Sequence, residues 1–67
     1  MITTDDELRT TLARIAWMQE QLAHLRKVEL NPVNYRSSAA GFLAEVDRMH
    51  LEVREFLATH PAELVSP

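Results

Sequence analysis

Two acid–histidine pairs in this chain have the residue types and spacings of metal ligands on a helix. Glu20 and His24 stand four residues apart, and Asp47 and His50 stand three apart. Residues at these spacings share one face of a helix, and carboxylate–histidine pairs build di-iron sites in helical bundles. Such a site also needs several inward-facing glutamates, and the apolar rows of this chain contain none. We therefore expect no metal and no cofactor.

A third combination would suit phosphate chemistry. Arg54 and His60 bracket the stretch REFLATH, which resembles the Arg-x(4–6)-His signature of the HEPN ribonuclease superfamily. That superfamily implies a longer domain of four or five helices, whereas here the motif ends a helix rather than opening one. Gly41 is the only glycine, which excludes the glycine-rich phosphate and dinucleotide motifs. The sequence predicts no catalytic residue, and we expect no enzyme activity.

Composition limits the kind of protein that can position these residues. A chain of 67 residues forms at most one small domain, whose core rarely contributes more than about 3–5 kcal/mol. There is no cysteine for disulfides or zinc, so oligomerisation or a partner remains as support. The net charge of −3 disfavours a nucleic-acid partner. With no signal peptide and no apolar run of about 20 residues, we expect a cytoplasmic protein without a membrane segment.

The first helix is predicted over residues 5–29. Thr4 and Glu7 match a capping box, in which the Thr4 hydroxyl and the Glu7 carboxylate each accept from the backbone amide of the other residue. Ile2 precedes the cap and is expected to fold back toward Leu8. The row that follows predicts one apolar face along the whole helix. Its members recur every three or four residues and are Leu8, Leu12, Ile15, Met18, Leu22 and Leu25.

A corner is predicted at residues 30–34. Asn31 can cap a new helix with Pro32 at its first position. Ser37 and Ser38 are alternative caps one to two turns later. The second helix is therefore predicted to begin at residue 32 or at residue 37.

The second helix is predicted to end at residue 60, and residues 61–67 are expected to form a flexible C-terminal tail. Leu43, His50 and Leu57 make a minor row along this helix. The main apolar row alternates spacings of four and three and comprises Tyr35, Ala39, Phe42, Val46, Met49, Val53, Phe56 and His60.

These elements predict an all-α fold, a two-helix antiparallel hairpin over residues 1–60, because the corner is short. The second helix shows three apolar positions per heptad, more than the two that a simple helix pair covers. We therefore expect a homodimer in which two hairpins form a four-helix bundle. The predicted interface comprises Leu12, Ile15, Trp17, Met18, Leu22, Leu25, Phe42, Val46, Met49, Val53 and Phe56.

Two residues leave alternatives open. Trp17 projects roughly opposite the apolar row at about 100° per residue, so one hairpin cannot cover it. It is either an interface anchor or an exposed ring packed along its own helix. Gly41 forms a small-residue patch with Ala39 and Ala40, inside a helix where glycine costs about 1 kcal/mol. The patch marks either tolerance near a helix start or the close approach of another helix.

The segment ITTDDELRTTLARIAWMQEQL, residues 2–22, resembles the opening of HigA-type antitoxins from bacterial toxin–antitoxin pairs. Those proteins begin with a similar Ile-Thr-x-x-x-Glu/Tyr-x-x-x-Leu-x-x-Ile phrase and form a helical hairpin. The resemblance implies a hairpin that dimerises or holds a protein partner. The antitoxins continue into a helix-turn-helix DNA-binding domain that has no counterpart in these 67 residues, so no functional residue is carried over.

Three functions remain open at the level of sequence. The favoured interpretation is a small non-enzymatic hairpin for self-association or protein–protein interaction. The second gives the apolar face to a different protein, as an antitoxin or an adaptor would. The third is RNA binding by a dimeric bundle of the Rop kind, which would require Arg14, Arg26, Lys27 and Arg36 to converge on one face.

Overall fold

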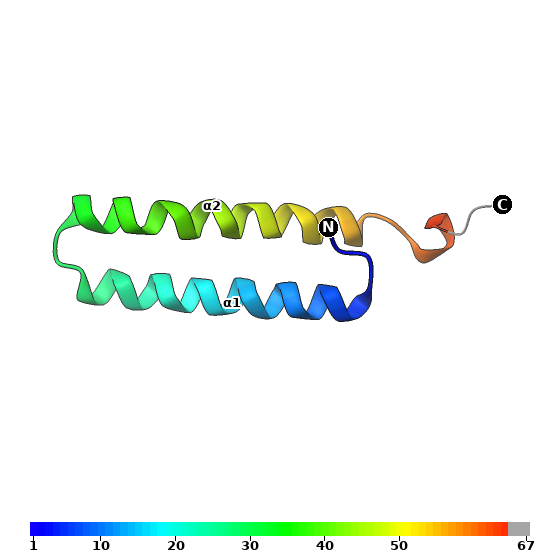
Figure 1. The fold of residues 1–67 in the computed structure, drawn as a ribbon, viewed down its shortest axis with the longest axis horizontal. Helices are drawn as coiled ribbons and strands as arrows, with labels where there is room; N and C mark the ends of the chain where they lie inside the picture. Colours follow the sequence, from blue (N-terminus) through cyan, green and yellow to red (C-terminus); the bar gives the residue numbers. More distant parts are fainter. Residues whose placement is uncertain (65–67) are drawn as a thin grey trace.

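The chain forms two long α-helices that run antiparallel, side by side, in a computed structural model that describes residues 1–64 (Figure 1). Helix α1 spans Asp5–Val28, helix α2 spans Pro32–Leu57, and a short 3-10 helix, η1, spans Pro61–Leu64. The predicted all-α, two-helix hairpin is confirmed. The last three residues of the predicted tail lie outside the described residues.

The side chain of Thr4 caps the N-terminus of helix α1. Its Oγ1 accepts a hydrogen bond of 3.1 Å from the Glu7 backbone N–H, which is the first half of the predicted capping box. The second half differs from the prediction, because the Glu7 carboxylate accepts from the hydroxyls of Thr3 at 2.6 Å and Thr4 at 3.2 Å. These bonds, with the one from Thr3 the stronger influence, lower the pKa of Glu7.

The corner is a turn of three residues between Val28 and Pro32. The side-chain oxygen of Asn31 accepts hydrogen bonds from Val33 N at 2.9 Å and from Asn34 N at 3.3 Å. Pro32 follows in the first turn, where the N–H that proline lacks would have no partner within the helix. Of the two predicted starts, helix α2 therefore uses the one at residue 32, and both serines lie inside the helix.

Helix α2 ends at Leu57, three residues before the predicted end at residue 60. Pro61 disfavours the helical conformation at the residue before it and has no N–H to donate. The Thr59 N–H donates to the Phe56 carbonyl at 3.2 Å, a three-residue turn that tightens the helix end. The apolar row continues to residue 60 in the sequence, but the constraint of the proline stops the helix about one turn earlier.

The core is a single stripe of side chains between α1 and α2. Met49 is 2% exposed and Ala39 is 1% exposed, which makes them the most deeply buried residues of the hairpin. Ile2 joins the stripe from outside both helices, and Leu8 packs against the same cluster. Among the residues whose burial the structure describes, the buried ones are Ile2, Ile15, Leu22, Ala39, Val46, Met49 and Val53.

The hairpin is only one helix layer thick. With the η1 segment that projects beyond α2 included, the chain has extents of 57 × 17 × 13 Å and a radius of gyration of 15.7 Å, against about 11 Å for a compact domain of this length. The accessible surface is 5412 Å², whereas a compact monomer of 7.7 kDa would expose about 4,300 Å². Since each helix packs against only one other helix, the flanks of both helices reach solvent.

Candidate interaction surface

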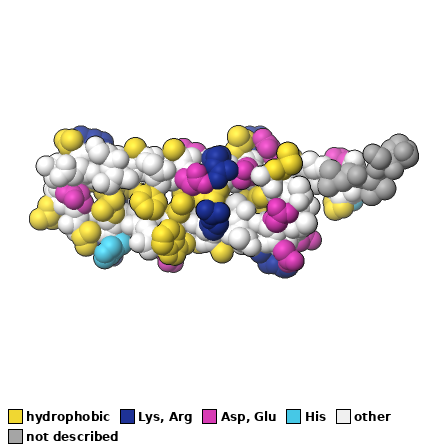
Figure 2. Space-filling model, viewed as in Figure 1, with side chains coloured by type: hydrophobic (Ala, Val, Ile, Leu, Met, Phe, Trp, Pro, Cys, Tyr) yellow, Lys and Arg dark blue, Asp and Glu magenta, His cyan; other side chains and the backbone are white. Residues whose placement is uncertain are grey.

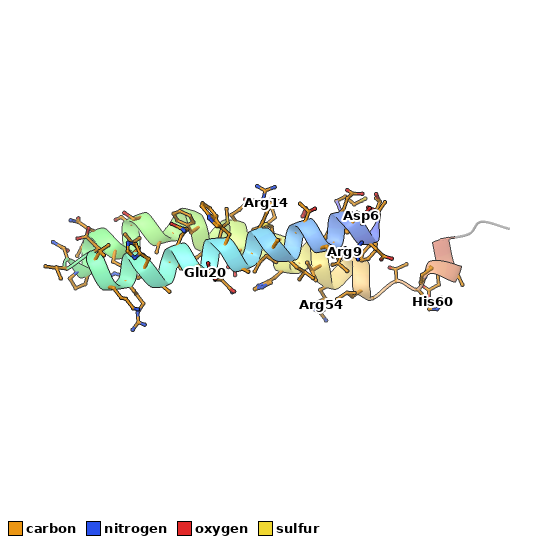
Figure 3. All side chains as sticks on the ribbon, turned by 90° about the horizontal axis from the view of Figure 1, so that it is seen from below. Asp6, Arg9, Arg14, Glu20, Arg54 and His60 are labelled. Atoms are coloured by element: carbon orange, nitrogen blue, oxygen red, sulfur yellow. The ribbon has the colours of Figure 1, made fainter. Side chains whose placement is uncertain are left out.

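The side chains that could do chemistry do not converge. Within residues 1–64, no three histidine or acidic side chains gather where a metal ion could be held. Arg54 lies on α2, whereas His60 lies beyond the helix end, where its Nδ1 accepts from Ala62 N at 3.0 Å (Figure 3). No polar or charged side chain in this part of the chain is buried, so none has the desolvated environment that catalytic groups commonly use. None of the helices described here is long and apolar enough to cross a membrane.

The predicted interface residues fall into three groups by exposure. Five are buried inside the hairpin, namely Ile15, Leu22, Val46, Met49 and Val53. Four are half-buried, namely Met18, Leu25, Phe42 and Phe56. Leu12 and Trp17 are exposed, at 45% and 55% respectively. The centre of the predicted seam therefore packs α1 against α2 of the same chain, and only the last two groups present surface to another molecule.

One face of the hairpin has a covered half and an open half. We call it the strap face, because residues 1–4, the strap, turn back from the start of α1 and cross toward α2 (Figure 1). The Met1 amino group lies 3.5 Å from Oε1 of Glu52 on α2. Ile2 is only 8% exposed and belongs to the core cluster. The strap thus gives this half of the face a third packed segment.

A belt of four charged side chains crosses the middle of the strap face, with Arg14 on α1 and Glu45, Arg48 and Glu52 on α2. Arg48 donates from Nη1 to Glu52 at 2.8 Å and from Nε to Glu45 at 3.3 Å, and its Nη2 contacts Glu45 as well. Arg48 lowers the pKa of Glu45, and Arg14 adds a smaller attraction to that carboxylate. Two acids and two bases leave the belt neutral, and Figure 2 shows both kinds together near mid-face.

The half of the strap face nearer the loop, the open half, carries an apolar hollow. One part of the hollow is lined by Met18, Ser38, Gly41 and Phe42. An adjoining part along α1 is lined by Thr10, Ala13, Arg14, Trp17 and Met18, so Met18 is common to both. A Cβ atom built on Gly41 would meet nothing within 4 Å, so the hollow is open above this residue. Hydrophobic side chains gather over this half of the face in Figure 2.

Most residues of this surface were predicted from the sequence, but their arrangement as one surface was not. Trp17, Met18 and Phe42 were predicted interface residues, and for Gly41 two interpretations stayed open, tolerance near a helix start or the close approach of another helix. The belt was missed, although Glu45, Arg48 and Glu52 follow the three- and four-residue spacing of helical ion pairs. That spacing is the signal that would have marked a polar boundary between the two halves.

The basic residues that RNA binding would require do not share a face. Arg14 and Lys27 are thirteen residues apart on α1, which separates them by about 20 Å along the helix and about 140° around it. Arg26 and Lys27 lie in the last turn of α1, beside the negative end of the helix dipole. Arg14 and Lys27 therefore do not belong to one continuous basic row along α1.

The fold and its half-open face define a small all-α hairpin with an exposed apolar hollow on one face. Comparison with known proteins adds no family, since no protein-family model, no curated protein and no solved structure matches the chain. Function is therefore inferred from the geometry of the hairpin itself.

Proposed function

We propose that this chain is a non-enzymatic interaction protein whose hairpin self-associates as a homodimer, with two hairpins packed as a four-helix bundle. The observation that carries the proposal is the single-layer shape, which leaves large apolar side chains exposed on the helix flanks. Trp17, Leu43 and Leu57 are between 49% and 65% exposed. Each 100 Å² of such surface removed from water contributes about 2.5 kcal/mol, and a second helix layer is the ordinary way to remove it.

The surface area also supports a second copy. The whole chain, including the η1 segment that projects beyond the two helices, exposes about 1,100 Å² more than a compact monomer of its mass. An interface of standard size buries about 800 Å² on each partner. A dimer of that size would bring the exposed surface of each chain close to the compact value.

A different protein is the competing occupant of the apolar face, as in an antitoxin or an adaptor. The resemblance of residues 2–22 to HigA-type antitoxins supports that alternative. No feature of the described residues is specific to a foreign partner, so the second copy takes precedence. The proposal places the protein in the cytoplasm, because a small chain without cysteine lacks the disulfides that stabilise many small secreted domains.

Sedimentation equilibrium of the purified chain tests the proposal, with helicity measured by circular dichroism over the same concentrations. We expect a helical species of twice the chain mass of 7.7 kDa. A helical monomer at millimolar concentration would overturn self-association. A poorly helical chain that folds only when a different protein is added would also overturn self-association. The apolar face would then be the binding surface for that protein.

A further inference from the structure

The strap face can stack on its own copy in two ways about a two-fold axis. With the axis along the hairpin, both loops lie at the same end, and α1 of each chain rests on α2 of its partner. With the axis across the hairpin, the loops lie at opposite ends, and each helix rests on its own copy. Both arrangements bring the same patch of two chains together. The sizes of the side chains on the open half distinguish them.

In the open half, the large exposed side chains lie on α1, and the small residues that line the hollow lie on α2. Helix α1 contributes Trp17, which is 55% exposed, and Met18. Helix α2 contributes Ser38, Gly41 and Phe42 to the hollow; Phe42 is half-buried, and nothing lies within 4 Å of the position that a Cβ of Gly41 would take. With the loops at opposite ends, the open half of each chain would face the covered half of its partner, so neither the Trp17 ring nor the space over Gly41 would meet a complementary surface, and close-packed interiors avoid such voids. When α1 of each chain stacks on α2 of its partner, the large side chain of Trp17 lies over the free space at Gly41 on both sides of the two-fold axis.

Trp17 and Gly41 also lie at nearly the same height along the hairpin. Met18 lines the hollow together with Gly41 and Phe42. Trp17 is the residue next to Met18 on a helix that rises about 1.5 Å per residue. Rotation about an axis along the hairpin does not change the position of a residue along that axis. The Trp17 ring of one chain therefore lies over Gly41 of the other.

Resting on the self-association proposed above, we infer that the two chains pair with their loops at the same end, and that Trp17 of each chain fills the hollow over Gly41 of the partner. The two belts then come together at the middle of the bundle. Arg14 stands close enough to Glu45 to attract its carboxylate within one chain. In the dimer, Arg14 also faces Glu45 of the partner, which is complementary in charge, and each belt is neutral as a whole.

The position of the strap agrees with this pairing. The strap crosses the half of the face away from the hollow, with Met1 beside Glu52. When the loops share one end, the two straps meet each other and leave both hollows free for Trp17. When the loops lie at opposite ends, each strap would be laid over the open half of the partner, on top of its bulkiest side chain.

Two substitutions test the contact without removing the core of the hairpin. Gly41→Leu fills the hollow, and its side chain has free space in the single chain and favours a helix. Trp17→Ala removes the ring that fills the partner's hollow. We expect each to raise the dimer dissociation constant at least 30-fold (about 2 kcal/mol), as loss of a central aromatic anchor does, with helicity retained.

Matched controls lie on the outer side of α2. Leu51→Ala removes a side chain that is 54% exposed, nearly as exposed as Trp17. Ala40→Leu places the same leucine one residue from Gly41, about 100° around the helix. Both controls are expected to dimerise like the unmodified chain.

A distance measurement tests the orientation. The chain has no cysteine, and Leu30 in the loop is 91% exposed, so Leu30→Cys provides one spin label per chain. Same-end pairing brings the two labels within about 20 Å, because packed helices lie about 8–10 Å apart. Opposite-end pairing separates them by about 40 Å, the length of α2 at about 1.5 Å per residue.

The outcomes separate the two proposals. The short label distance, together with dissociation by Gly41→Leu and Trp17→Ala, supports the pairing. A dimer with labels about 40 Å apart, or one that Gly41→Leu leaves intact, overturns the pairing while self-association stands. An unmodified chain that is monomeric at every concentration overturns self-association itself, and the pairing with it.

Discussion

The same two helices build both halves of the strap face, yet only one half is closed. In the covered half, Ile2 is 8% exposed and packs into the core cluster. In the open half, Trp17 is 55% exposed beside an apolar hollow that is open above Gly41. The apolar rows of α1 and α2 run through both halves, so the difference comes from the third segment. Two packed helices bury only the apolar stripe that each presents to the other. Side chains on the flanks of the helices are removed from water only when a further element packs against them.

Different interactions maintain the two halves, and this predicts different responses to mutation. The covered half is closed within one chain, by Ile2 in the core and by hydrogen bonds from Thr3 and Thr4 to Glu7. Substitutions there should change the free energy of unfolding. Substitutions at Trp17 and Gly41 in the open half should change association instead.

The largest effect is expected from Val46→Asp, which places a carboxylate where the native side chain is 4% exposed between the helices. A buried, unpaired charge costs several kcal/mol, comparable to the roughly 3–5 kcal/mol that a core of this size supplies. We expect loss of the helical circular dichroism signal at neutral pH. The control is Leu51→Asp, at a position that is 54% exposed, which should remain helical. Retention of mass and helicity by Val46→Asp would show that the core is wrongly assigned.

Removing the strap's apolar anchor comes next. Ile2→Ala deletes a side chain that packs with the buried residues of both helices, and we expect a loss of about 2 kcal/mol in the free energy of unfolding. Leu30→Ala, at 91% exposure, should change it by less than about 0.5 kcal/mol. Urea unfolding followed by circular dichroism measures both. Equal midpoints for the two variants would mean that the strap does not dock in solution.

Helix caps at the two ends of the strap face give a smaller effect. Thr4 caps α1 at the covered end, and Asn31 caps α2 at the loop end. Alanine at either position should cost about 1 kcal/mol, because one or two backbone N–H groups lose their acceptor. Ser37→Ala inside α2 removes a hydroxyl without such a role and should be neutral within about 0.5 kcal/mol. Thermal unfolding of the three variants in parallel would reveal any departure from this order.

Local sequence signals accounted for the helices. The caps at Thr4 and Asn31 depend on residues two or three positions apart, and the apolar rows depend on helical periodicity, so both could be read from the chain. The strap could be predicted only in part. Ile2 was expected to turn toward Leu8, but the contact from Met1 to Glu52 joins residues 51 positions apart and leaves no periodic trace.

The open half was harder to predict for a geometric reason. Each of its side chains could be assigned to a helix face, but the hollow depends on how α1 and α2 are rotated and offset against each other. Trp17 and Gly41 were therefore predicted as separate features, one for each helix. The structure sets Trp17 beside Met18, and Met18 beside Gly41, which makes them parts of one surface.

The smallest predicted effect concerns pH and the covered half. Hydrogen bonds from the hydroxyls of Thr3 and Thr4 hold the pKa of Glu7 below its ordinary value of 4.5 in the folded chain. A lowered pKa in the folded state stabilises the fold above the pKa of the unfolded state, and this contribution is lost as the pH falls through the folded-state value. We expect Thr3→Val to weaken the acid dependence of the urea midpoint between neutral pH and pH values below about 4.

The control for that measurement is Thr10→Val, which removes a hydroxyl on α1 that makes no hydrogen bond to Glu7. Glu45, whose pKa is lowered by Arg48, contributes acid sensitivity in both variants, so only the difference between them reports on the strap. If Thr3→Val and Thr10→Val lose stability in parallel as the pH falls, the hydroxyls do not hold Glu7 in solution. The covered half would then be closed by Ile2 in the core and by the contact from Met1 to Glu52, without a contribution from the threonine hydroxyls.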